Sequence, residues 1–395
     1  MPDRGAGYAG ALFVWRYILR IKGENRLAEA ETQKKAKENK KKSKRGQEKT
    51  RGEKRMVEEM GKASDDATRE AYGKAGENGV PFEPPFPYMD AHCDTLTCCA
   101  DRRASLSLNQ GQVDVARLWQ AGCALQTFAV WLDPVYYDRP LRQALLYLEY
   151  FEEQRRESLG MLAPVLCRED LFQNLQAGKI SALLTIEGGE VLEGELFLLH
   201  TLFRLGVRGM NLVWNHPNAL GHPAVEPGDE GLTAFGRDVV REMERLHMIP
   251  DVSHLNRAGF WDVAALCQGP FMASHSNAQA LCPHPRNLTD DQLLCLIDRQ
   301  GFVGLNFCPS FLREEGAAKV EDVLRHGERI LRLGGENVLG LGSDFDGIET
   351  TPEGLEGTQA LPGFWERLTR EWGRELAEKV AYRNFLDFLS RTLPQ

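Results

Sequence analysis

Several features are missing from this chain of 395 residues, and each absence excludes a class of protein. No apolar stretch reaches the roughly 18–20 residues that span a membrane, because Arg16 interrupts the nearest candidate, AGALFVWRYILRIKG. No CxxC pair occurs among the nine cysteines, whose odd number and scatter favour buried free thiols over a disulfide framework. Because a basic tract follows the apolar run, we expect no secretion signal, no membrane partner and a cytoplasmic location.

Charge is divided unevenly between the first 80 residues and the rest of the chain. The formal net charge is −9, but residues 1–80 hold 20 Lys and Arg against 13 Asp and Glu, a balance of +7 that leaves −16 for the remainder. The chain after residue 80 is acidic enough to repel nucleic-acid phosphates, so we expect no nucleic-acid partner for this part of the protein.

Residues 1–87 read as a basic, low-complexity arm that ends in a proline-rich linker. The tract KKAKENKKKSKRGQEKTRGEK cannot bury enough apolar surface to fold alone, so we expect a disordered or helical extension. Four prolines within residues 81–87 then block helix and sheet alike. Two further readings stay open: the arm contacts RNA or an anionic surface, or the gene start is over-extended and Met89 is the initiator.

From residue 88 onward, short apolar runs alternate with amphipathic helical segments. In TAFGRDVVREMERLH, for example, Phe235, Val239, Met243 and Leu246 recur at helical spacing. Eight buried-type strands alternating with helices predict an α/β fold, a (β/α)8 TIM-like barrel over residues 88–395. A doubly wound open sheet is the alternative, but no GxGxxG or P-loop follows the first strand. The expected strands are residues 88–94, 123–132, 181–187, 207–214, 248–254, 271–275, 302–307 and 338–345.

Polar side chains fall where several of these strands end. Carboxyl ends of barrel strands line one mouth, so groups from different strands converge there. Imidazoles and carboxylates together suit zinc or a similar divalent ion, and their number exceeds what one tetrahedral ion uses. The alternative is a buried polar network without metal. The candidate residues are His92, Asp94, Glu187, His254, His275 and Asp344.

Seven segments, taken in order, resemble the membrane dipeptidase (renal dipeptidase) family, which is the zinc peptidase family M19. The resemblance covers the chain from about Tyr88 to its end and leaves the arm without a counterpart. It implies a metal-dependent hydrolase barrel. The segments are DAHCDTL, LLTIEGGEVL, GVRGMNLVWNHPNALG, GLTAFGRDVVREMERLHMIPDVSH, FMASHSNAQALCPHPRNLTDDQL, FVGLNF and GLGSDFDG.

The resemblance assigns a metal role to each histidine of the group. His92 and Asp94 match the ligands of a first zinc ion, His254 and His275 match those of a second, and Glu187 matches the carboxylate that bridges both. Two Zn²⁺ per chain are therefore expected, with Mn²⁺ or Co²⁺ as substitutes that these ligands do not reject sharply.

Other positions match groups that handle the substrate. Asp344 matches the acid that handles the proton at the scissile nitrogen, and Arg286 matches the arginine that pairs with the substrate's terminal carboxylate. Many relatives have a histidine where this chain has Trp214, followed here by Asn215 and His216. Either Trp214 or His216 is expected to take over the substrate contact of that histidine.

The expected activity is hydrolysis of free dipeptides, with tolerance of a D-residue at the C-terminal position. Two ions would lower the pKa of a shared water and supply hydroxide as the nucleophile. A homodimer is expected by analogy. Three alternatives remain: a binuclear hydrolase of N-acyl amino acids or another small amide; a nucleobase or lactone hydrolase, disfavoured because HxD replaces HxH; and a catalytically silent scaffold with a binding arm.

Overall fold

The structure is a computed structural model, and it describes residues 86–395 of the chain. The predicted basic arm and almost all of its linker therefore lie outside the described residues. Within the described part, no helix is both long and apolar enough to cross a membrane.

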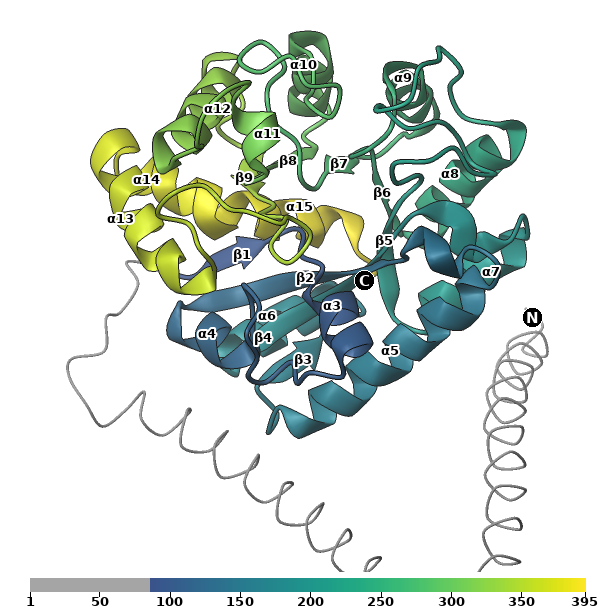
Figure 1. Cartoon of the computed structure of the whole chain (residues 1–395), viewed down its shortest axis with the longest axis horizontal. Coiled ribbons are helices and arrows are strands. Elements are labelled where there is room, and N and C mark those ends of the chain that lie inside the picture. The colour runs from purple at the N-terminus through teal and green to yellow at the C-terminus, as the bar shows by residue number, and fades with distance from the viewer. Residues whose placement is uncertain (1–85) are drawn as a thin grey trace, which may run out of the picture. The chain divides into compact units, whose positions relative to one another are not determined.

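The predicted barrel is confirmed: eight parallel strands form a closed ring (Figure 1). Each strand pairs with the next in chain order, apart from one extra strand described below, and the last strand closes the ring by pairing Leu341 with Asp90. The eight strands are β1 (Tyr88–Asp90), β2 (Cys123–Trp131), β4 (Ile180–Glu187), β5 (Val207–Asn211), β6 (Ile249–Asp251), β7 (Met272–Ala273), β8 (Phe302–Leu305) and β9 (Leu339–Leu341).

A ninth strand, β3 (Leu162–Pro164), lies outside this ring and was not predicted from the sequence. It pairs with the start of β4, while β5 pairs with the end of β4. Both lie along one edge of β4, because β2 occupies the other edge over residues 181–187. A three-residue run that ends in proline carries too little alternation to be recognised as a strand.

Helices surround the ring, as the amphipathic segments predict (Figure 1). The predicted apolar face of α8 is present: Val239 and Met243 are buried, and Thr233 caps the helix by accepting from the Gly236 N–H at 2.9 Å. The α-helices are α3 (Thr95–Arg102), α4 (Val115–Gln120), α5 (Pro140–Glu157), α6 (Arg168–Gln176), α7 (Leu196–Arg204), α8 (Ala234–Leu246), α9 (Arg257–Leu266), α10 (Asp290–Asp298), α11 (Pro309–Leu312), α12 (Val320–Arg332), α13 (Leu361–Trp372), α14 (Arg374–Glu378) and α15 (Asn384–Thr392).

The last helix, α15, closes the amino end of the barrel. Phe385 and Phe388 pack with residues at the starts of strands, such as Met272 and Phe302, and the rings of Phe302 and Phe385 lie 4.4 Å apart. This apolar plug excludes water from one end of the ring. Polar chemistry is therefore confined to the opposite end, where the strands terminate.

Candidate active site

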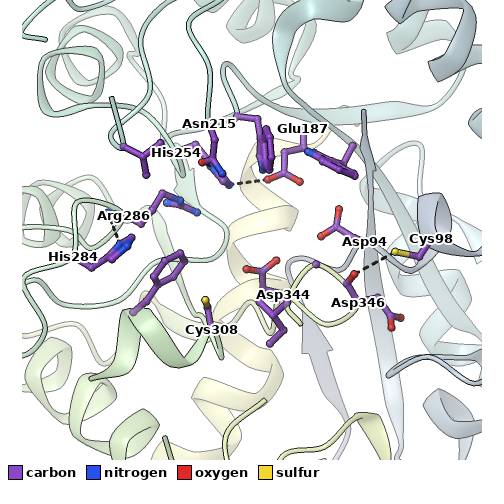
Figure 2. Close-up of a pocket in the computed structure, with 16 residues that line it drawn as sticks. Asp94, Cys98, Glu187, Asn215, His254, His284, Arg286, Cys308, Asp344 and Asp346 are labelled. Carbon is purple, nitrogen blue, oxygen red and sulfur yellow. Dashed lines mark hydrogen bonds and ion pairs between the residues drawn. The ribbon is translucent and has the colours of Figure 1, made fainter. Parts of the chain in front are cut away.

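Glu187 is the centre of a group of buried imidazoles at the carboxyl end of the ring. It is the last residue of β4, and its two carboxylate oxygens face different partners, of which Figure 2 shows His254. Oε2 lies 3.3 Å from His92 Nε2, whereas Oε1 lies 2.8 Å from His254 Nε2 and 3.7 Å from His275 Nε2. Such a carboxylate can bind one cation with each oxygen, which is the geometry of a bridging ligand.

Asp94 joins this group, although it does not lie on the first strand, where the sequence placed it. Strand β1 stops at Asp90, Cys93 makes an isolated bridge with Phe345, and the chain then turns into α3 with Asp94 at its N-cap. The turn brings Asp94 Oδ2 to 3.4 Å from His92 Nε2. The two side chains therefore meet as predicted, but through the start of a helix.

The donor atoms fit a metal centre better than a closed hydrogen-bond network. His254 Nε2 and His275 Nε2 are only 3.0 Å apart, and their other nitrogens face Asn215 Oδ1 and Ser274 Oγ. Within residues 86–395, His92 Nε2 and Asp94 Oδ1 are buried without a hydrogen-bond partner. Lone pairs gathered in this way would be left unsatisfied without a cation. Three overlapping groups could hold one: His92, Asp94 and Glu187; Glu187, His254 and His275; and His92, His275 and Asp344.

Burial and mutual charge set the protonation states of these groups. Burial lowers the pKa of His254 to about 4 and that of His275 well below its usual value, so both imidazoles stay neutral and able to coordinate. Burial and the Glu187 charge raise the pKa of Asp94 to about 7. Burial would raise the pKa of Glu187 as well, but His92 and His254 outweigh it and hold that pKa below its usual range.

Asp344 occupies the edge of this group in a strained conformation. Its Oδ1 lies 3.8 Å from His92 Nε2, its Oδ2 accepts a hydrogen bond from Asn306 Nδ2 at 2.9 Å, and burial raises its pKa to about 6. The φ angle is 63° at Asp344, 64° at Asp346 and 73° at His254. Non-glycine residues in this region cost about 1–3 kcal/mol each, and such strain clusters at functional sites.

Two buried carboxylates brace the loops that carry the site residues. Asp90 Oδ1 accepts from the N–H groups of His92 and Ser343 at 3.2 and 2.9 Å, and its Oδ2 accepts from the Ser343 hydroxyl at 2.5 Å. Asp251 Oδ1 similarly accepts from the N–H of Ser274 at 3.1 Å and from that of Ser253 at 2.9 Å. Ser343 directly precedes Asp344, and Ser274 directly precedes His275. The hydrogen bonds to these two serines therefore fix the backbone position of both candidate site residues.

Arg286 lies in a cavity of about 420 Å³ beside the candidate metal ligands. Its side chain is in the loop after β7, only 4% of the residue is exposed, and its guanidinium lies 5.5 Å from the centre of the Phe311 ring. Within residues 86–395 no carboxylate oxygen approaches the guanidinium within 4.0 Å, and Nε has no hydrogen-bond partner. A buried cation without a counterion is costly unless a ligand supplies the anion. Figure 2 shows Arg286 and His284 on one side of the cavity and Asp94, Asp344 and Asp346 across it.

The segment after β5 separates into residues that reach this cavity and one that does not. Trp214 and Asn215 line the cavity, and Asn215 Oδ1 lies 3.0 Å from His254 Nδ1. His216 does not line it: its side chain is 49% exposed, and its Nδ1 lies 3.2 Å from Glu226 Oε1. Of the two candidates for the substrate contact, the structure therefore brings Trp214 to the site and leaves His216 at the surface.

Comparison with known proteins gives the family. Residues 83–392 match the sequence profile of the membrane dipeptidase family, peptidase family M19. The chain belongs to this family. As a member, the protein is a dipeptidase whose family implies a metal cofactor, and the barrel and the clustered ligands agree with that assignment.

Three relatives illustrate the family likeness. A metallopeptidase called dipeptidase AC is 32% identical, with a TM-score of 0.74 over 79% of this chain and 100% of its own. A metallopeptidase from Rhodobacter sphaeroides, solved with a phosphinate mimic of the dipeptide L-Ala-D-Ala, is 32% identical, with a TM-score of 0.73 over 78% of this chain and 99% of its own. Dipeptidase aclJ of Aspergillus oryzae is 32% identical over 65% of this chain and 64% of its own length.

Sequence reasoning missed several residues that this family member places at the site. Asn306, just after β8, orients Asp344, and Trp131, the last residue of β2, lines the cavity. Both stand at strand ends, so the criterion that found the other site residues would have found them had it included neutral side chains. Asp346 also lines the cavity, and it holds the neighbouring loop by accepting from Thr95 Oγ1 at 2.6 Å and from the Gln112 N–H at 2.7 Å.

Proposed function

We propose that this dipeptidase hydrolyses free dipeptides with two divalent ions, Zn²⁺ in the first instance, and that it accepts a D-residue at the C-terminal position. The observation that carries the proposal is the buried guanidinium of Arg286, which has no carboxylate oxygen within 4.0 Å among residues 86–395 and lies in the same cavity as the carboxylate and imidazole cluster. A fixed cation beside the cluster favours a substrate with a free carboxylate close to its scissile bond.

The chain's own residues would hold the metal ions in two sets. His92 and Asp94 face one oxygen of Glu187, and His254 and His275 face the other, which supports two ions that share Glu187. When bound, such ions lower the pKa of a water molecule towards neutrality and polarise a carbonyl oxygen. The neutral imidazoles of His254 and His275 suit this role because their lone pairs are free.

Arg286 would bind the terminal carboxylate of the substrate. A guanidinium forms two parallel hydrogen bonds with a carboxylate, so it fixes orientation as well as position. Because the loop after β7 holds Arg286 in the same cavity as the cluster, a carboxylate bound there would lie close to the scissile bond. Longer peptides would have no partner for this cation and would leave it buried and unpaired.

Asp344 would carry the proton that the leaving amine requires. An amide nitrogen leaves poorly unless it is protonated, and burial raises the pKa of Asp344 to about 6, near the value that suits proton transfer in neutral solution. Asn306 Nδ2 donates a hydrogen bond to Oδ2 of Asp344. The other oxygen, Oδ1, faces the cluster and can exchange the proton.

Acceptance of a D-residue is supported by the Rhodobacter sphaeroides relative, which binds a mimic of L-Ala-D-Ala. The test is amine release from Ala-Ala, Ala-D-Ala, Ala-Ala amide and N-acetyl-alanine, with the full chain loaded with zinc and again after chelation. We expect metal-dependent cleavage of the two free dipeptides and resistance of the amide. Cleavage of N-acetyl-alanine alone would instead establish the small-amide alternative, and no turnover despite two bound ions per chain would refute dipeptide hydrolysis.

A further inference from the structure

The cavity has an apolar side that the proposed chemistry does not use. Trp131 and Trp214, which contact each other, form it, and Val225 lines the same cavity from the loop that follows Trp214; the three are hereafter the tryptophan wall. The two indole rings meet edge to face, with centroids 5.1 Å apart and planes at 63°. Edge-to-face packing is a favourable arrangement that holds both rings in place, so this side of the cavity presents a fixed apolar surface.

The order of strands places Trp131 across the mouth from Arg286, and Trp214 and Val225 in the loop after β5, between the two. In the ring β1–β2–β4–β5–β6–β7–β8–β9, β2 and β7 are four places apart, which is diametrically opposite. Trp131 ends β2 and pairs in register with Glu187, while Arg286 follows β7. A dipeptide whose carboxylate is held by Arg286 therefore extends over the cluster towards Trp131.

The remaining members of the wall border the cluster itself. The centroid of the Trp214 ring lies 6.4 Å from that of His254. The N–H of Ala224 donates to the His254 carbonyl at 2.7 Å, which fixes Val225, a residue 39% exposed, at the rim. Of the acidic residues of the cavity, Asp94, Asp344 and Asp346 come from the segments after β1 and β9, whereas Glu187, a candidate metal ligand, ends β4 beside Trp131. Apart from Glu187, charge and the indole rings thus come from different strands.

We propose that the tryptophan wall is the subsite for the side chain of the substrate's N-terminal residue, and that it selects dipeptides beginning with a large apolar residue. The inference rests on the proposed function, because Arg286 must hold the opposite end. A glycine or alanine at the first position leaves the indole faces in contact with water, whereas a leucine or phenylalanine covers them and removes apolar surface from solvent.

The test measures kcat and KM of the zinc-loaded full chain for Gly-Ala, Leu-Ala and Phe-Ala, and for the reversed series Ala-Leu and Ala-Phe. We expect the wild type to prefer Leu-Ala or Phe-Ala over Gly-Ala by about tenfold or more, a size typical of hydrophobic discrimination. Trp131→Ala should reduce this preference to about threefold or less, mainly by raising KM for the large substrates. Trp131→Phe, which keeps an aromatic face, should retain most of it.

Two further variants make the outcome decisive. Val225→Ser changes a rim residue that is 39% exposed, so it is expected to fold, and it should weaken the preference in the same direction. Trp119→Ala removes a tryptophan on α4 that is 41% exposed and far from the cavity lining, and it should leave the preference unchanged. Equal cleavage of Gly-Ala and Leu-Ala by the wild type, or a preference that survives Trp131→Ala and Val225→Ser, would overturn the subsite. Failure to cleave any dipeptide would instead refute the proposed function.

Discussion

Replacing Arg286 by methionine should separate stability from activity in this protein. Methionine has a similar length and no charge, so it fills the same space beside Phe311 without the buried cation. Arg286 is 4% exposed, and the one hydrogen bond that its guanidinium makes within residues 86–395, from Nη2 to the His275 carbonyl, is long at 3.5 Å. In the zinc-loaded protein the metal ions would neutralise the carboxylates around Arg286, so methionine would remove the cost of a buried ion without breaking a close ion pair. We therefore expect the free energy of unfolding of Arg286→Met to be unchanged or increased.

The same substitution should damage catalysis towards free dipeptides. Losing one partner of a buried, hydrogen-bonded charge pair costs about 2–5 kcal/mol. Since 1.4 kcal/mol corresponds to a factor of ten, kcat/KM for Ala-Ala should fall by roughly 30-fold to a few thousandfold. The wild type should discriminate against Ala-Ala amide by a similar factor, and Arg286→Met should lose that discrimination, because neither substrate then has a cationic partner.

The assay is a four-way comparison of two enzymes and two substrates, together with chemical denaturation of both proteins. Arg241→Met is the matched control, because that arginine is an exposed helix residue paired with Asp238 at 2.7 Å. It should alter neither the unfolding free energy beyond a few tenths of a kcal/mol nor the discrimination. If Arg286→Met unfolds more easily and loses equal activity towards both substrates, Arg286 acts through the structure and the carboxylate assignment is wrong.

Four further predictions follow from the site. Glu187→Gln should lower the bound metal, measured by elemental analysis, from two ions per chain to one or none, because the amide offers a single oxygen. Asp251→Ala leaves the buried N–H groups of Ser253 and Ser274 without an acceptor, so it should lower the free energy of unfolding by about 2 kcal/mol or more. The control Asp238→Ala, on the exposed face of α8, should not lower it. His216→Ala should change kcat/KM less than about twofold, since that side chain is exposed and paired with Glu226; a larger loss would place it at the substrate. Chelation should lower Tm. As pH falls from 8 to 6.5, the free energy of unfolding of the chelated protein should rise by an amount on the order of 1 kcal/mol, because burial raises the pKa of Asp94 to about 7 in the folded chain and proton uptake there favours folding. An unchanged free energy of unfolding would contradict the raised pKa.

The sequence was sufficient to predict the barrel because its strands are buried on both faces. Buried parallel strands read as continuous apolar runs, and each of the eight predicted runs overlaps a barrel strand. Their ends were less accurate: β1 was expected to reach residue 94 but stops at Asp90, because Cys93 makes a separate bridge to Phe345 and α3 then begins. Extended backbone and hydrogen-bonded strand look alike in a sequence, and only the neighbouring strand decides between them.

The site was partly predictable for a related reason. Charged residues that directly follow apolar runs are conspicuous, so the candidate ligands could be identified from their positions alone. Trp131 and Asn306 occupy equivalent positions but are neutral, so they do not stand out from the strands they follow. The contrast between Trp214 and His216 could not be predicted either, because it depends on how the long loop after β5 folds against His254 and on the partner that Glu226 provides.

The excess of buried negative charge explains why this arrangement calls for cations. Besides Asp346, five carboxylates, those of Asp90, Asp94, Glu187, Asp251 and Asp344, lie near the mouth of the ring, while Arg286 is the one guanidinium that lines the cavity among residues 86–395. Asp90 and Asp251 are satisfied by backbone N–H groups, but such hydrogen bonds add no positive charge. Repulsion among the other three shows in the raised pKa values of Asp94 and Asp344, to which the Glu187 charge contributes. Divalent ions would remove this repulsion, so the feature that makes the metal-free fold costly is the same feature that binds the metal.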